Sequence, residues 1–90
     1  MLKIGIIGCG KITEVRHAPE YSENPDCEIT ALYNPTTEKA AALAQKYGGR
    51  VCQSVEELLA SDVDAVSVCT ANRFHAAMSI QALEAGKHVL

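Results

Sequence analysis

The sequence lacks the features that direct a protein to a nucleic acid or a membrane. It has no run of basic residues and a formal net charge of −3, so it does not offer the clustered Lys and Arg that nucleic acids and anionic membranes attract. No apolar stretch reaches the roughly 20 residues that a membrane-spanning helix needs. The N-terminal apolar run is too short and too rich in glycine for a signal peptide. We therefore expect a cytoplasmic protein whose partner is a small molecule.

The cysteines also lack any metal-binding or redox spacing. Cys9, Cys27, Cys52 and Cys69 form no CxxC pair and no histidine is interleaved with them, so neither a zinc site nor a redox motif is predicted. Four free thiols fit a reducing compartment. Cys9 lies where a helix N-terminus could lower the pKa of a thiol and make it reactive. The alternative is that its side chain only has to fit the loop.

Two residue periods alternate from one end of the chain to the other. Apolar runs rich in Ile and Val are typical of buried parallel strands, and the longer stretches between them carry apolar residues three or four positions apart, as helices do. The pattern predicts strands at residues 2–7, 28–33, 50–52, 65–69 and 88–90, and helices at 11–23, 37–47, 55–60 and 73–84. Repeated βαβ units of this kind form an α/β, Rossmann-like doubly wound parallel sheet in the order 3-2-1-4-5.

Local signals mark several helix ends. Ser54 followed by Glu57 forms a capping box, in which hydroxyl and carboxylate each satisfy a free backbone N–H. Thr36 or Thr37 can cap the helix at 37–47, and Gly86 ends the last helix.

The most informative motif is Gly8-Cys9-Gly10, which directly follows the first strand and precedes a predicted helix. Gly8 allows a tight strand-to-helix turn and Gly10 lets phosphates approach the backbone, while the helix N-terminus offers free N–H groups and a partial positive charge. This arrangement is typical of a site for the pyrophosphate of a dinucleotide. The match to GxGxxG is incomplete, because Thr13 occupies the third glycine position.

Ligands of such a sheet bind beyond the carboxyl ends of the strands, where the strand order reverses. Three polar loops are predicted to meet there, at residues 8–12, 34–37 and 70–75. A carboxylate after the second strand would bind the adenosine ribose and repel a 2′-phosphate, but this position holds Asn34. The neutral amide permits NADP as well as NAD, with Thr36, Thr37 and Lys39 as candidate donors. Alternatively, this loop serves only as a turn and helix cap.

The third loop carries the amide of Asn72 and the imidazole of His75 at the start of a helix. Asn72 is also a good N-cap, and His75 faces either the nicotinamide or only solvent. We expect His17 on the first helix near solvent and His88 at the start of the last strand.

Three segments together resemble the N-terminal part of the Gfo/Idh/MocA family of NAD(P)-dependent oxidoreductases: GCGKIT, ALYNPTTEKAAALAQKYG and VDAVSVCTANRFHAAMSIQALEAGKHVL. The resemblance covers essentially the whole chain, and the TxNxxH loop followed by ALEAGKHVL is its most specific part. Ala71 stands where the family commonly has proline. Thr13 and Asn34 replace a small and an acidic residue of the family pattern.

The resemblance implies an oxidoreductase that acts with NAD or NADP on a CH–OH group of a sugar, cyclitol or similar polyol. It implies cofactor contacts from Gly8, Gly10, Lys11 and Ile12 at the pyrophosphate, from Asn34 at the adenosine ribose, and from Thr70, Asn72 and His75 at the nicotinamide side. The family's catalytic lysine belongs to a Glu-Lys-Pro motif that would follow Leu90, so no catalytic residue is assigned.

A doubly wound dinucleotide fold normally needs roughly 150 residues, and this chain has 90. We therefore expect residues 1–90 to be an incomplete N-terminal NAD(P)-binding domain, inactive alone and without the domain that shapes the substrate site. The strand near Leu90 would then be an unprotected edge that favours self-association. Two alternatives stay open: a stand-alone, non-catalytic nucleotide-sensing or interaction module, and a related fold that binds another adenine-containing cofactor.

Overall fold

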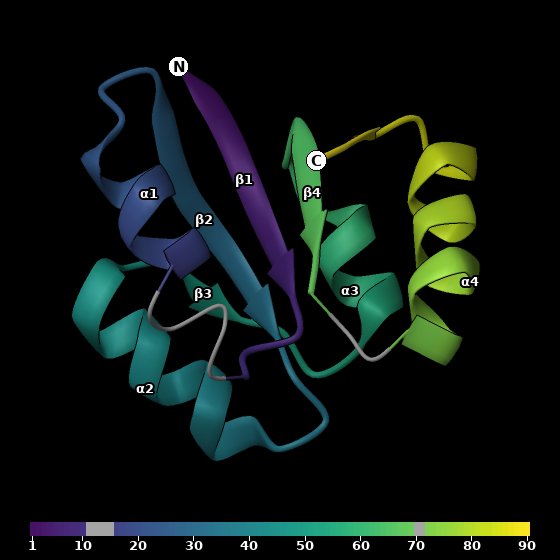
Figure 1. Cartoon of the computed structure of the whole chain (residues 1–90), viewed down its shortest axis with the longest axis horizontal. Helices are drawn as coiled ribbons and strands as arrows, with labels where there is room; N and C mark the ends of the chain where they lie inside the picture. Colours follow the sequence, from purple (N-terminus) through teal and green to yellow (C-terminus); the bar gives the residue numbers. More distant parts are fainter. Residues whose placement is uncertain (11–15, 70–71) are drawn as a thin grey trace.

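The computed structural model describes residues 1–10, 16–69 and 72–90. Five parallel strands form one sheet in the predicted order, β3-β2-β1-β4-β5. The strands are β1 Leu2–Ile7, β2 Cys27–Tyr33, β3 Arg50–Val51, β4 Ala65–Val68 and β5 His88–Val89. The arrows of β1, β2 and β4 run in the same direction (Figure 1). Their carboxyl ends therefore meet at one edge of the sheet.

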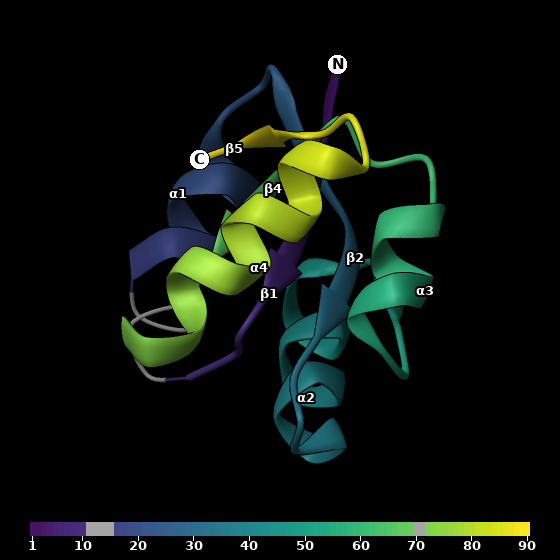
Figure 2. The same ribbon diagram turned by 90° about the vertical axis from the view of Figure 1, so that its right-hand side faces the viewer.

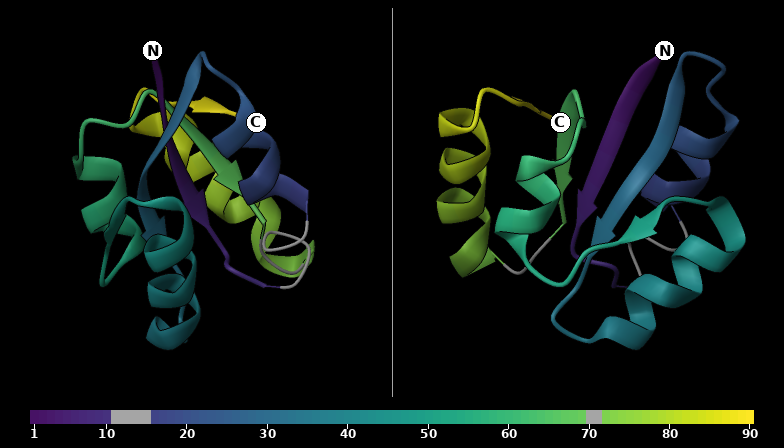
Figure 3. Two further views of the ribbon diagram at one scale, coloured as in Figure 1. Left: turned by 90° about the vertical axis from the view of Figure 1, so that its left-hand side faces the viewer. Right: turned by 180° about the vertical axis from the view of Figure 1, so that it is seen from behind.

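Helices cover both faces of this sheet. They are α1 Ala18–Glu23, α2 Thr37–Tyr47, α3 Val55–Ala60 and α4 Asn72–Glu84. One face is covered by α1 and α2 and the other by α3 and α4 (Figures 2 and 3). This is the doubly wound arrangement that the alternating strand and helix pattern predicts.

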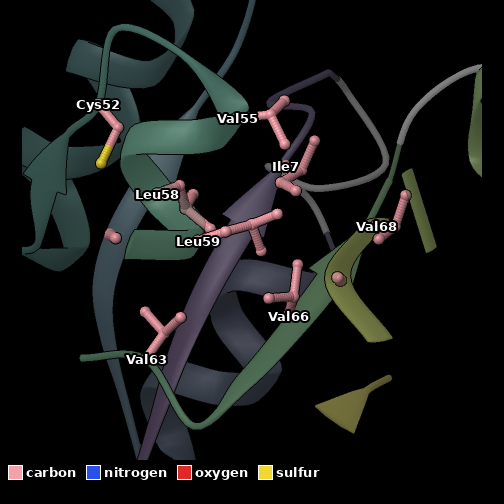
Figure 4. Packing of buried hydrophobic residues seen from close by; sticks show 10 residues of the cluster. Ile7, Cys52, Val55, Leu58, Leu59, Val63, Val66 and Val68 are labelled. Atoms are coloured by element: carbon pink, nitrogen blue, oxygen red, sulfur yellow. The ribbon is translucent and has the colours of Figure 1, made fainter. Parts of the chain in front are cut away.

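The sheet divides the apolar core into two clusters. Ile7, Leu58 and Val66 belong to the cluster between the sheet and α3 and α4, where their side chains point toward one another (Figure 4). Ile4 and Ile6 belong to the cluster on the α1 and α2 side. Neighbouring residues of β1 thus pack on opposite faces, and each fully buried aliphatic side chain contributes about 1.5–3 kcal/mol.

Gly5 allows α3 to lie close to β1. A Cβ atom at this position would lie 2.8 Å from Cδ2 of Leu58 and 3.1 Å from Cγ1 of Val63. The first distance is shorter than carbon–carbon van der Waals contact, so any larger residue would push the helix side chains away. A glycine in the middle of β1 therefore serves packing, a role that the apolar pattern of the strand does not reveal.

β2 contains a bulge that shifts its pairing with β1. The register changes between Ile4 and Gly5, and Thr30 is the residue of β2 that has no partner in β1. Ile29 and Leu32 are three residues apart and nevertheless belong to the same cluster, which an uninterrupted strand would not permit. Among the described residues, no group bonds the buried Oγ1 of Thr30.

The predicted element ends agree with the structure to within one residue wherever both can be compared. β2 begins at Cys27 and α4 at Asn72, each one residue before its predicted start. The residues directly before Asn72, on which its predicted N-cap role depends, lie outside the described residues. The described part of the first helix begins at Ala18, with Pro19 in its first turn. The predicted start at residue 11 lies outside the described residues.

The capping predictions had two different outcomes. Ser54 caps α3 as predicted, since its Oγ accepts a 3.0 Å hydrogen bond from the backbone N–H of Glu57, and the Glu57 carboxylate accepts one from the N–H of Gln53. Thr36 is the N-cap of α2, but its side chain forms no capping hydrogen bond. The predicted position of the cap is therefore confirmed at Thr36, although its side chain does not make the bond.

Candidate cofactor-binding site

A pocket of about 460 Å³ opens at the carboxyl ends of β1, β2 and β4. It is lined by Gly8, Gly10, Asn34, Pro35, Thr36, Cys69, Phe74 and Met78. These residues come from the loops after β1 and β2, the end of β4 and the first half of α4. The structure thus brings together two of the predicted loops with the described part of the third, at the point where the strand order reverses.

Glycine occurs at positions 8 and 10 of the first loop for two different structural reasons. Gly8 has φ +98°, a conformation that L side chains rarely adopt, so the turn after β1 requires glycine there. Gly10 does not have a positive φ, and no described atom lies within 4 Å of where its Cβ would stand. Nothing in the described protein therefore demands glycine at position 10, which leaves room for a ligand close to the backbone.

Asn34 uses its side-chain amide to join the two loops. Its Oδ1 accepts a 2.8 Å hydrogen bond from the backbone N–H of Cys9. Its Nδ2 donates a 3.1 Å hydrogen bond to the carbonyl oxygen of Thr36. The turn-forming interpretation of this loop is therefore correct for Asn34. Contact with the adenosine ribose stays a prediction, because an amide has a second hydrogen and a second lone pair to offer.

The thiol of Cys9 is not activated. Its side chain is buried, and Sγ lies 3.6 Å from the carbonyl oxygen of Tyr33. Burial, and to a smaller extent the neighbouring Cys69, raises the pKa of the Cys9 thiol to about 11. This shift is opposite in direction to the lowered pKa that the reactive interpretation required, so Cys9 is a protonated packing residue at neutral pH.

Cys69 lines the pocket, and contacts with α1 and β1 fix its position. Its Sγ lies 3.4 Å from Oγ of Ser67, and this oxygen in turn accepts a 3.1 Å hydrogen bond from the phenol of Tyr21. The backbone N–H of Cys69 donates a 2.7 Å hydrogen bond to the carbonyl oxygen of Ile7. The end of β4 is thereby connected both to α1 and to β1.

The other predicted site residues are placed as follows. Lys11, Ile12 and Thr70 lie outside the described residues, as does the side chain of Asn72. His75 is exposed and is not among the residues that line the pocket. His88 opens β5 as predicted.

Sequence reasoning missed the apolar wall of the pocket. Phe74 and Met78 both line it, and their spacing of four places them on one side of α4. Phe74 is the only phenylalanine of the chain. This spacing directly after a polar strand end was the available signal, but it also fits an ordinary core-facing helix.

The described lining residues include no charged side chain. Within residues 1–10, 16–69 and 72–90, no group of three or more His, Cys, Asp or Glu side chains could hold a metal ion. No helix in the same part of the chain has the length and hydrophobicity to cross a membrane. Among the described residues, the polar groups that line this pocket are therefore backbone groups and neutral side chains.

Residues 2–90 match the family model of the Gfo/Idh/MocA proteins, described as an oxidoreductase family with an NAD-binding Rossmann fold. The chain belongs to the Gfo/Idh/MocA oxidoreductase family. The fold and the position of the pocket agree with a cofactor-binding domain of this family, and the predicted family and cofactor class, NAD or NADP, are confirmed.

Three proteins illustrate the similarity. D-glucoside 3-dehydrogenase of Escherichia coli (strain K12) is 41% identical over 91 aligned positions, which cover 99% of this chain and 26% of that protein. L-aspartate dehydrogenase of Methanococcus maripaludis is 34% identical over 91 positions, which cover 100% of this chain and 34% of the relative. The crystal structure of a 3-ketoreductase from Actinomadura kijaniata in complex with NADP and TDP-benzene has a TM-score of 0.95 at 36% identity, over 99% of this chain and 28% of that one.

This chain therefore spans about a quarter to a third of the length of the curated relatives that it matches. The matched part corresponds to the NAD-binding Rossmann fold.

Proposed function

We propose that this chain is the N-terminal cofactor-binding domain of an NAD(P)-dependent oxidoreductase acting on a CH–OH group of a sugar, cyclitol or similar polyol. When bound, the nicotinamide ring would accept or donate the hydride. The single observation that carries the proposal is the 460 Å³ pocket that joins the Gly8–Gly10 loop to the end of β2 and to α4. The open space at Gly10 supports the fit of a pyrophosphate.

The relatives support a division of labour between this domain and the remainder of the enzyme. A D-glucoside dehydrogenase and an L-aspartate dehydrogenase both match over 99% or more of this chain, although their names state unlike substrates. The shared region is therefore expected to bind the common cofactor. On this proposal, substrate selection and the catalytic lysine belong to parts of the enzyme outside residues 1–90, and the chain alone has no oxidoreductase activity.

The residues of this domain would bind and orient the cofactor. Backbone N–H groups of the loop at residues 8–10 would bind the pyrophosphate, assisted by Lys11 and Ile12. Asn34 would lie near the adenosine ribose, and Thr70, Asn72 and His75 near the nicotinamide. The apolar side chains of Phe74 and Met78 would exclude water from the same pocket.

We expect NADP to be accepted as well as NAD. The described residues that line the pocket include no carboxylate that would repel a 2′-phosphate. The matching ketoreductase structure contains NADP. A bound 2′-phosphate would lie near the N-terminus of α2, where Thr36 leaves the first N–H groups without a side-chain cap.

Calorimetric titration with NAD, NADH, NADP and NADPH tests the proposal. A Gly10→Asp variant places a negative charge where the pyrophosphate would approach, and we expect its affinity to fall below detection. Gln45→Glu is the matched control, since it adds the same charge on an exposed part of α2. Equal binding by Gly10→Asp and the parent chain, or no binding by a folded parent chain, would contradict the proposal.

The titration also separates the second candidate, a non-catalytic nucleotide-sensing module. Binding of one adenine nucleotide without the nicotinamide part, at an affinity equal to that of the dinucleotide, would favour sensing or another adenine-containing cofactor. A strong preference for the complete dinucleotide favours the oxidoreductase domain.

Self-association through the sheet edge is a further part of the proposal. β5 pairs with β4 through only two residue pairs, and Leu90 beside this edge is exposed, as is Leu83 on α4. An exposed edge is a template for pairing with a second copy. In analytical ultracentrifugation, we expect Leu90→Lys to reduce dimer formation and Met1→Lys, at an exposed position in the N-terminal region, to leave it unchanged. A chain that stays monomeric at millimolar concentration would contradict this.

A further inference from the structure

The side chain of Asn34 bonds to backbone groups of two loops that border the pocket. Its Oδ1 accepts the N–H of Cys9 at 2.8 Å, and its Nδ2 donates to the carbonyl oxygen of Thr36 at 3.1 Å. These two loops follow different strands and are 25 residues apart in sequence at the first contact. One amide therefore joins the glycine loop to the N-terminus of α2.

The backbone of the glycine loop is also bonded to the end of β2. The N–H of Gly8 donates a 2.8 Å hydrogen bond to the carbonyl oxygen of Tyr33, directly before Asn34. The thiol of Cys9 also points to that carbonyl, at the longer distance of 3.6 Å. Gly8 and Gly10 have no side chains that could anchor the loop. The end of β2 therefore supports this loop through both Tyr33 and Asn34.

The Cys9 N–H lies between Gly8 and Gly10, so its hydrogen bond affects how the glycine loop is oriented. A loop that binds a pyrophosphate has to present its remaining N–H groups at fixed positions, because each hydrogen bond is sensitive to distance and angle. The Asn34 bond occupies the Cys9 N–H and so fixes the plane of the Gly8–Cys9 peptide, which directly precedes the peptide that carries the Gly10 N–H. The direction of the following N–H groups depends on that plane.

Asparagine is the residue type that this place requires. The Cys9 N–H needs an acceptor and the Thr36 carbonyl oxygen needs a donor, and a carboxamide supplies both from one short side chain. An aspartate could accept from Cys9 but would present an oxygen without a hydrogen to the Thr36 carbonyl oxygen. An alanine would leave both backbone groups without this partner.

We propose that Asn34 is a positioning residue that holds the glycine loop in its pyrophosphate-binding conformation through the Cys9 N–H. This inference rests on the proposed cofactor function and adds a role to Asn34 beyond the ribose contact. A ribose ligand acts on the adenosine end, where NAD and NADP differ. A residue that positions the pyrophosphate loop acts equally on both cofactors.

The first test measures the loop without a ligand. In an Asn34→Ala variant, we expect amide hydrogen exchange of Cys9 to become at least about tenfold faster, since the N–H loses its acceptor. Asn24→Ala is the matched control: the Oδ1 of Asn24 accepts a 2.9 Å hydrogen bond from the N–H of Asp26, in the turn between α1 and β2. It removes the same kind of bond but should leave Cys9 exchange unchanged. Unchanged Cys9 exchange in Asn34→Ala would overturn the proposal.

The second test measures cofactor affinity in the same variants. We expect Asn34→Ala to lower the affinity for NADH and the affinity for NADPH by the same factor, about tenfold. Asn24→Ala should lower neither affinity. Asn34→Asp keeps the acceptor for Cys9, so it should recover part of the NADH affinity but not the NADPH affinity, because its charge repels the 2′-phosphate. If Asn34→Ala bound only one of the two cofactors more weakly, or neither of them, the positioning role would be overturned.

The two tests keep this inference separate from the proposed function. If the parent chain binds no dinucleotide, the proposed function fails, whereas the exchange of the Cys9 amide still decides whether Asn34 holds the loop. If the parent chain binds and Cys9 exchange is unchanged in Asn34→Ala, the proposed function stands and the positioning role fails.

Discussion

The phenol of Tyr21 on α1 donates a 3.1 Å hydrogen bond to Oγ of Ser67 on β4. Ser67 is 3% exposed and is the only buried polar residue among those that the structure describes. Its other side-chain contact is the thiol of Cys69 in the wall of the pocket. A short helix on one face of the sheet is thus connected by hydrogen bonds to the wall of the candidate cofactor-binding pocket.

Tyr21→Phe should reduce the free energy of unfolding by about 1 kcal/mol, because the buried Ser67 hydroxyl loses its strongest partner while the ring is kept. Urea denaturation followed by circular dichroism measures this. Tyr47→Phe is the control, since the phenol of Tyr47 makes no described hydrogen bond and its ring contacts Lys46. An equal loss in both variants would show that the Ser67 bond contributes nothing specific.

Gly5→Ala should destabilise the fold by about 1–3 kcal/mol, because the new Cβ would overlap Cδ2 of Leu58. Gly10→Ala adds the same methyl group where the described structure has open space, so its unfolding free energy should stay within about 0.5 kcal/mol of the parent value. The same denaturation experiment compares them. If Gly5→Ala were as stable as Gly10→Ala, α3 would not pack on β1 as closely as described.

Ser54→Ala and Thr36→Ala compare two helix starts that look alike in sequence. Ser54 Oγ accepts the N–H of Glu57, so its removal should cost about 1 kcal/mol. Thr36 makes no side-chain capping bond, and its removal should cost only a few tenths of a kcal/mol. Thermal unfolding of both variants checks this difference. A larger loss for Thr36→Ala than for Ser54→Ala would reverse the assignment of the two caps.

The Cys9 thiol should make stability fall in alkaline solution. An exposed thiol ionises near pH 8.5, whereas burial raises the pKa of Cys9 to about 11 in the folded chain. The raised pKa means that this contribution is fully present below about pH 8.5 and is lost as the pH rises toward 11, by at most about 1.4 kcal/mol per pH unit. Denaturation between pH 7 and pH 10.5 should show a weaker decline in Cys9→Ala. Cys27→Ala, which keeps Cys9, should decline as the parent does, and an unchanged slope in Cys9→Ala would contradict the effect of burial.

The strand order and the helix positions could be predicted from the sequence because they depend on local patterns of apolar and capping residues. Ile- and Val-rich runs alternate with helical spacing, and Ser54 and Glu57 form a capping box that the structure contains. The glycine at position 8 was also predictable, since a tight turn directly after β1 favours a residue that adopts a positive φ, and Gly8 has φ +98°.

The details of the candidate site depended on three-dimensional relationships that no local pattern contains. The bond from Asn34 to the Cys9 N–H joins residues far apart in sequence, and the raised pKa of Cys9 results from burial by several elements. The position of Cys9 in a glycine loop before a predicted helix suggested the opposite shift. The local position predicts a lowered pKa for an exposed thiol, but Cys9 is buried, and its desolvation raises the pKa and keeps the thiol protonated.

The bulge at Thr30 has a consequence for comparing this chain with other sequences. Because of the extra residue, Ile7 pairs with Tyr33, so Asn34 follows level with the glycine loop. Deleting the unpaired Thr30 would give a continuous ladder in which Ala31 still pairs with Gly5 and Tyr33 with Ile7, so Asn34 would stay level with the glycine loop. A sequence whose second strand lacks this bulge therefore aligns correctly with this chain only if a gap stands at Thr30, and an alignment without that gap would match Asn34 to the wrong residue.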